Sequence, residues 1–182
     1  MRLLVFATIL ATSLAVRAAE PSKAQSGLSK LPVALSDEFQ FRKTKLYFLD
    51  PAPPPLRRGK FGSSFSKTQA QPDASIGFER SYRMFGAVTG LDQRQRFGHY
   101  FDFWWRVKHD ANVTVRLEYR QEKLRSFTQA KEISYTGAKG TMHTEFRVIG
   151  DEFFDDGKII AWRCLLISDG RIVAEDRSYM WD

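Results

Sequence analysis

Residues 159–181, IIAWRCLLISDGRIVAEDRSYMW, contain the clearest structural signal in the chain. Asp169-Gly170 stands between two apolar runs. This dipeptide favours a two-residue hairpin turn, because Asp and Gly both tolerate the positive φ angles that such a turn needs. The stretch therefore predicts two antiparallel strands joined at residues 169–170.

The turn also predicts which residues of this hairpin face each other. Ile167 lies opposite Ile172, and Arg163 lies opposite Asp176. We expect this face to line the core, with Arg163 and Asp176 neutralising each other, because an unpaired buried charge is costly. The opposite face, which carries Cys164, is also largely apolar, so the sequence leaves open which face is buried.

Further short runs rich in Val, Ile, Phe, Tyr and Trp precede this hairpin, each closed by a turn signal. No ten-residue window shows clear helical spacing, so helices that could connect parallel strands are not expected. We therefore predict an all-β fold, an antiparallel β-sandwich of immunoglobulin or fibronectin type III-like architecture with about 7–8 strands. The expected strands are residues 38–49, 76–88, 100–107, 113–119, 127–134, 142–149, 159–167 and 171–181.

A second hairpin is expected from residues 100–107 and 113–119, which both alternate cleanly between apolar and polar residues. Matching their apolar faces places Phe103 and Leu117 toward the core and implies a loop near 109–111. The outward face then combines aromatic side chains with arginines, namely Tyr100, Trp104, Arg106, Arg116 and Arg120.

The N-terminus has the layout of a secretory signal peptide: a basic start, an apolar run over residues 3–16 and small residues at the end. We expect a signal peptide over 1–18, a flexible leader over 19–36 and a single domain over 37–182, with a long Pro/Gly/Ser-rich loop near 50–75. The apolar run is too short to span a bilayer, and the expected cleavage site has no cysteine for a lipid anchor. The protein is therefore expected to be secreted or periplasmic, with an uncleaved anchor as the alternative.

The composition is that of one ordinary globular domain, with 182 residues, 27% charged residues and a formal net charge of +7. The charge is uneven, with 15 Lys/Arg against 9 Asp/Glu in residues 19–110 and 11 against 12 in residues 111–182. The basic half favours an anionic partner such as a glycan or lipid headgroups, whereas export argues against nucleic acid. The simpler interpretation is a well-solvated surface.

The sequence offers no motif for catalysis or metal binding. Cys164 is typical of a small buried hydrophobic residue, and His99, His109 and His143 lie in separate segments. The acidic residues of 151–156 are a weak match to a Ca²⁺ loop, because alternating ligands are missing, and a solvated loop is the simpler interpretation. We therefore predict a non-enzymatic protein without metal or cofactor.

Exposed aromatic side chains next to guanidinium groups are typical of interaction surfaces, and flat rings also stack on sugars. The first hypothesis is an exported binding or assembly module that makes protein–protein contacts in the cell envelope or extracellular space. The alternative is a carbohydrate-binding module with a preference for anionic polysaccharides, and an envelope hydrolase with an unrecognised site comes third. Arginines that simply cover neighbouring Trp rings are the structural alternative. The candidate binding residues are Tyr100, Trp104, Arg106, Arg116, Arg120, Trp162, Arg177, Tyr179 and Trp181.

Overall fold

The structure is a computed structural model that describes residues 22–24, 31–51 and 74–181. The expected signal peptide, most of the leader and most of the 50–75 loop lie outside these residues. The elements, in chain order, are β1 (Ser22–Ala24), β2 (Phe39–Leu49), α1 (Ala74–Met84), α2 (Gly90–Arg94), β3 (Gly98–Gln121), a 3-10 turn (Glu122–Leu124), β4 (Thr128–Ile149), α3 (Asp151–Asp156), β5 (Ile159–Ser168) and β6 (Arg171–Arg177).

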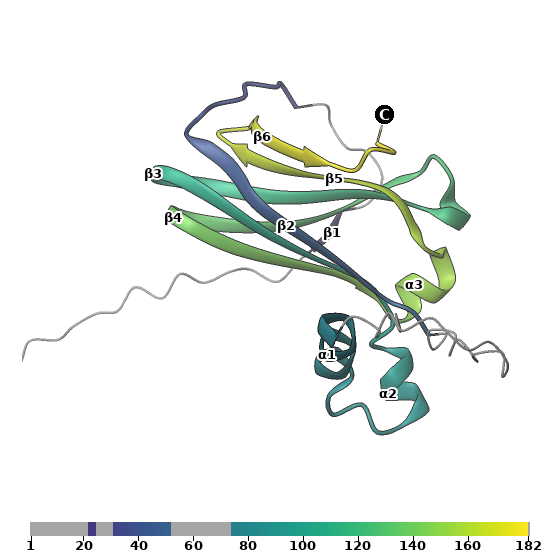
Figure 1. Cartoon of the computed structure of the whole chain (residues 1–182). Coiled ribbons are helices and arrows are strands. Elements are labelled where there is room, and N and C mark those ends of the chain that lie inside the picture. The colour runs from purple at the N-terminus through teal and green to yellow at the C-terminus, as the bar shows by residue number, and fades with distance from the viewer. Residues whose placement is uncertain (1–21, 25–30, 52–73, 182) are drawn as a thin grey trace, which may run out of the picture.

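The six strands of the described residues form one antiparallel sheet that curls over itself (Figure 1). The long strands β3 and β4 pair along almost their whole length. The first half of β3 has β2 on its other edge, and the second half has β5 there, which in turn pairs with β6. Irregular pairing of β3 with β4 between Val107 and Val113 separates the two halves, and such bulges let a strand bend.

The antiparallel, mostly β class is confirmed, whereas the immunoglobulin or fibronectin type III arrangement is not. The second predicted hairpin is wrong, because residues 100–107 and 113–119 are two halves of the single strand β3. Residues 127–134 and 142–149 are likewise halves of β4. The polar residues 109–111 resemble a turn, but their backbone stays extended beside β4.

Residues 76–88, expected to be a strand, belong mainly to helix α1, so this prediction is wrong. Phe78, Tyr82 and Phe85 are four and three residues apart, which is a helical spacing that the sequence prediction overlooked. Phe78 and Tyr82 lie exposed on the outward face of α1. Its inward face is held to the sheet by charged groups, as described below. Among the described residues, no helix is both long and apolar enough to cross a membrane.

The core lies inside the curl of the sheet. The odd-numbered side chains of β3 point into it on both sides of the bend, including Phe103, Trp105 and Leu117, which are fully buried. The sequence therefore predicted the buried face of β3 correctly although it predicted the wrong connection. The period of two is retained across the bulge, as Val107 and Val113 are both buried.

The Asp169-Gly170 turn is confirmed, with φ angles of 50° and 71°. Ile167 lies opposite Ile172 as predicted, but a bulge then shifts the pairing by one residue. As a result Arg163 lies opposite Arg177, and the predicted Arg163–Asp176 pair does not form. The Nε atom of Arg163 instead donates to Glu118 at 2.6 Å.

Both faces of this hairpin are buried. Cys164 and Leu166 belong to the main core, which corrects the expectation that the other face lines it. Leu165 and Ile167 form a smaller cluster that Leu31 covers. The segment that contains Leu31 runs along β6, with hydrogen bonds between residues 32–36 and residues 172–173.

His99, at the start of β3, is enclosed by aromatic rings. Its ring stacks on Phe48 with centroids 4.5 Å apart and meets the edge of Phe153 at 6.1 Å. Its Nε2 atom accepts a hydrogen bond from the backbone N–H of Ile159 at 3.1 Å, which requires the neutral ring. Burial, assisted by the nearby charge of Lys158, lowers the pKa of His99 from 6.5 to about 4.

We predict that the free energy of unfolding falls as the pH drops from 6.5 to about 4, because the unfolded chain protonates His99 and the folded chain does not. The pKa difference corresponds to at most about 3 kcal/mol. His99→Gln, whose amide oxygen can accept the same N–H, should lose this part of the acid sensitivity. Urea denaturation of both proteins at about pH 7 and about pH 4 measures the effect. Equal losses in the two proteins would contradict the prediction.

Candidate functional site

A pocket of about 730 Å³ lies between α1 and the outer face of β2, β3 and β4. We call it the α1 pocket. The sheet provides its floor, because polar side chains of β3 and β4 alternate with the buried ones and point away from the core. The pocket is lined, among others, by Arg83 from α1, Lys45 from β2, Asp102 and Trp104 from β3, and His143 and Glu145 from β4.

Two carboxylates face each other across the floor of the pocket. Asp102 of β3 lies directly opposite Glu145 of β4 in the strand register. Like charges in this position repel and destabilise an antiparallel pair unless a cation lies between them. The arrangement therefore requires a positive group between the two carboxylates.

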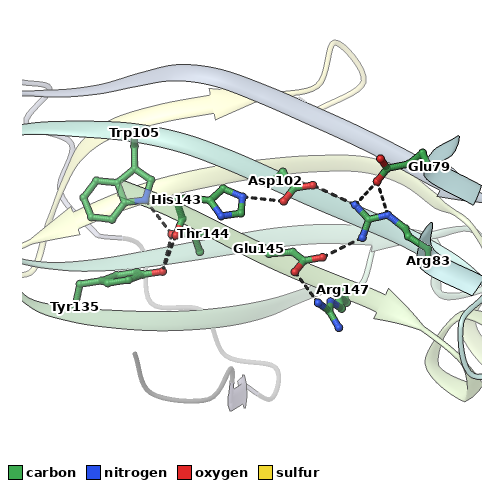
Figure 2. A network of polar contacts seen from close by, with 9 residues as sticks. All are labelled: Glu79, Arg83, Asp102, Trp105, Tyr135, His143, Thr144, Glu145 and Arg147. Carbon is green, nitrogen blue, oxygen red and sulfur yellow. Dashed lines mark hydrogen bonds and ion pairs between the residues drawn. The ribbon is translucent and has the colours of Figure 1, made fainter. Parts of the chain in front are cut away.

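Arg83 of α1 supplies this charge, as Figure 2 shows. Its guanidinium lies 3.0 Å from a Glu145 oxygen, 3.3 Å from an Asp102 oxygen and 2.7 Å from Glu79 of its own helix. The same group lies over the Tyr100 ring, 3.9 Å from its centroid. The Arg83 side chain is only 8% exposed, so these contacts attach α1 to the sheet.

Glu145 is held in its charged form. Burial alone would raise its pKa, but hydrogen bonds from Arg147 and Arg83 outweigh burial and keep the pKa of Glu145 below its ordinary value. Arg147 lies on the same strand, with its guanidinium 2.7 Å from Glu145. The floor of the pocket is thus a fixed set of alternating charges.

Trp104 lies two residues after Asp102 on β3 and lines the next part of the pocket. His143, opposite it on β4, stacks on its ring with centroids 4.6 Å apart. The Nε2 atom of His143 is 2.8 Å from Asp102, which orients the imidazole. On the β2 side, the ammonium groups of Lys43 and Lys45 lie 5.4 and 5.7 Å from the Trp104 ring centre.

A second polar network in Figure 2 lies on the core side of the same strands. Trp105 donates to the Thr144 hydroxyl at 2.9 Å, and the Tyr135 hydroxyl lies 2.8 Å from it. These three side chains are buried, so their hydrogen bonds satisfy polar atoms inside the core. We assign them a structural role.

The candidate residues predicted on β3 are dispersed by the fold. Tyr100 lies on the outer face of β3 as predicted, but it is only 3% exposed, because Arg83 of α1, a helix not expected from the sequence, covers its ring. Trp104 is partly exposed in the α1 pocket, and Arg106 is exposed. Arg116 pairs with Glu132, and the Arg120 guanidinium lies 4.6 Å from the Trp181 ring centre.

The candidates on the C-terminal hairpin separate in the same way. Trp162 packs against the core rings of Phe101 and Phe103. Trp181 is 6% exposed, and the guanidinium groups of Arg120 and Arg163 lie over its ring. This agrees with the alternative hypothesis that arginines simply cover neighbouring Trp rings. Arg177 and Tyr179 are exposed.

The other chemical candidates of the sequence do not converge. His109 pairs with Glu38 at the surface, far along β3 from His99 and His143. The acidic residues 151–156 form α3, where Asp151 pairs with Arg94 and Phe153 is buried. In the described part of the chain, no group of three or more His, Cys, Asp or Glu side chains is arranged to hold a metal ion.

Sequence reasoning missed the residues that build the pocket, namely Glu79, Arg83, Glu145 and Arg147. The cross-strand pair of Asp102 and Glu145 becomes visible only when β3 and β4 are paired as long strands. Glu79 and Arg83, four residues apart, are a helical ion-pair signal that was available in the sequence.

Comparison of the chain with protein-family models, with curated proteins and with solved structures finds no significant match.

We predict that Arg83→Ala lowers the free energy of unfolding by about 2 kcal/mol, because Asp102 and Glu145 then face each other without the cation that bridges them. The figure allows for the partial exposure of the carboxylates. Lys139→Ala is the control: its pair with Asp110 is well exposed, so the expected change is below about 0.5 kcal/mol. Urea denaturation measures both. Equal effects would show that the Arg83 contacts contribute no more than a surface pair.

Proposed function

We propose that this protein is an exported, non-enzymatic binding module whose α1 pocket holds an anionic saccharide. The observation that carries the proposal is the partly exposed Trp104 ring, with two lysine ammonium groups on its β2 side. A Trp ring offers a flat apolar surface to the C–H face of a sugar. The lysines offer charge for a carboxylate, sulfate or phosphate on the same ligand.

The lysines of this site can move toward a ligand. Lys43 and Lys45 are exposed, and their contacts with the Trp104 ring at 5.4 and 5.7 Å are weak cation–π interactions. A charged hydrogen bond to a ligand anion is stronger than such a contact. His143, fixed by Asp102, holds the Trp104 ring in place, so the aromatic part of the site is already formed before the ligand binds.

The saccharide hypothesis is preferred to protein contacts through the C-terminal hairpin. The rings that would act as protein hot spots there, Trp162 and Trp181, already pack inside the fold or against arginines. Trp104 instead lines a pocket that opens to solvent. The proposal includes export, which the signal-like N-terminus suggests. It also includes classification of the curled sheet as sandwich-like.

We predict that the protein binds uronate or sulfate-bearing oligosaccharides, and that Trp104→Ala weakens the binding at least about tenfold, as expected for loss of a central aromatic contact. Lys43→Ala/Lys45→Ala should weaken binding and reduce its dependence on salt. Isothermal calorimetry with polygalacturonate fragments and dextran sulfate measures the affinity, with neutral dextran as the ligand control.

Tyr179→Ala is the matched protein control, because Tyr179 is an aromatic residue with 97% exposure outside the pocket. It should bind like the wild type, and thermal melting should show that all variants fold. Equal affinity of the Trp104 variant and the wild type would refute the site. Equal affinity for neutral and anionic ligands would refute the role of the lysines.

A further inference from the structure

Helix α1 is amphipathic, but its charged face is turned toward the protein and its aromatic face toward solvent. Such helices ordinarily bury their apolar face and expose their charges. In α1 the Arg83 side chain is 8% exposed, whereas Phe78 and Tyr82 are 70% and 67% exposed. The charged face thus holds the helix to the sheet, and the aromatic face is left without a partner within the described chain.

The exposed apolar surface continues beyond α1. Phe85 and Val88, in the connection to α2, are 85% and 84% exposed, and Leu91 of α2 is also exposed. The rings of Phe78 and Tyr82 stack with centroids 6.4 Å apart, so this part of the surface is continuous. We call Phe78, Tyr82, Phe85, Val88 and Leu91 the apolar ridge. Figure 1 shows α1 and α2 together at one end of the curled sheet.

We propose that the apolar ridge docks this protein onto the surface of a bilayer that contains anionic lipids. Aromatic and aliphatic side chains on one helix face are the groups that enter the boundary between headgroups and acyl chains. With 11 residues, α1 is shorter than the roughly 20 residues that cross a bilayer, so the contact we propose is interfacial.

Charge selects the lipid surface over a second copy of the chain. After removal of the expected signal peptide, which carries Arg2 and Arg17, the net charge falls from +7 to +5, so two copies repel each other while an anionic surface attracts each of them. Arginines at positions 80, 94 and 96 lie on or beside the two helices of the ridge; Arg94 is paired with Asp151, whereas Arg80 donates to the uncharged backbone carbonyl of Asp50. Residues 74–97 carry four arginines against two acidic residues, Glu79 and Asp92, so this region has an excess of positive charge.

The proposal does not depend on the saccharide site, although the two surfaces adjoin. Tyr82 and Phe85 belong to the ridge and also line the α1 pocket. A protein docked through the ridge would therefore hold the pocket close to the headgroups. Trp104 and its lysines come from the sheet and are not part of the ridge.

The test is co-sedimentation of the purified protein with vesicles of phosphatidylcholine alone and of phosphatidylcholine with one third phosphatidylglycerol. We predict binding to the anionic vesicles that weakens with added salt, and at least about tenfold weaker binding of Phe78→Ser/Phe85→Ser. Tyr179→Ser removes an aromatic side chain that lies outside the ridge and is even more exposed, and it should bind like the wild type. Trp104→Ala should also bind like the wild type, which separates this proposal from the saccharide site.

Because the ridge residues are exposed, the serine variants should fold, and circular dichroism checks this. Failure of the wild type to bind anionic vesicles would overturn the proposal, as would equal binding by the ridge variant. Sedimentation velocity completes the test. A concentration-dependent dimer that the serine substitutions abolish would assign the ridge to a second copy and overturn the membrane assignment.

Discussion

The opposed carboxylates of Asp102 and Glu145 are the constraint on which the site depends. Their strands bring them face to face, and the sheet tolerates the pair because Arg83 places its guanidinium between them. The cation comes from a helix, so neutralising the pair also positions that helix. An apolar contact between α1 and the sheet would have oriented the helix the other way.

Both proposed surfaces follow from this orientation. The charged face of α1 turns toward the sheet and leaves the α1 pocket beside it, with Trp104 and His143 on the floor. The aromatic face turns outward and forms the apolar ridge. The pocket combines a flat ring with cations, and the ridge combines apolar side chains with a basic protein. The proposed role, an exported binding module that works at an anionic surface, would account for both.

The local alternation of the sequence predicted much of the sheet. It identified β2, β5, β6, the Asp169-Gly170 turn and the buried face of β3. It did not identify the continuity of β3, because residues 109–111 have turn-like composition although long-range pairing with β4 keeps them extended. It also overlooked α1, although Phe78, Tyr82 and Phe85 have helical spacing. The local pattern could not show that ion pairs with the sheet, rather than this apolar stripe, hold the helix. Of the predicted aromatic binding residues, Trp104 alone lies in the pocket and is partly exposed. That His143 and Glu145 lie in the same pocket could be predicted only from the pairing register of β3 and β4.

The claim that Arg83 holds α1 in this inverted orientation is tested most directly by hydrogen–deuterium exchange of the α1 amides. Arg83→Gln removes the charge that docks α1 on the sheet but changes the helix propensity little, because Arg and Gln favour helices similarly. A difference in exchange between the wild type and this variant therefore reports the docking of α1. The account predicts protected amides over residues 78–84 in the wild type and a loss of that protection in the variant, while β3 and β4 stay protected. Rapid exchange of α1 in the wild type, or unchanged protection in the variant, would contradict it.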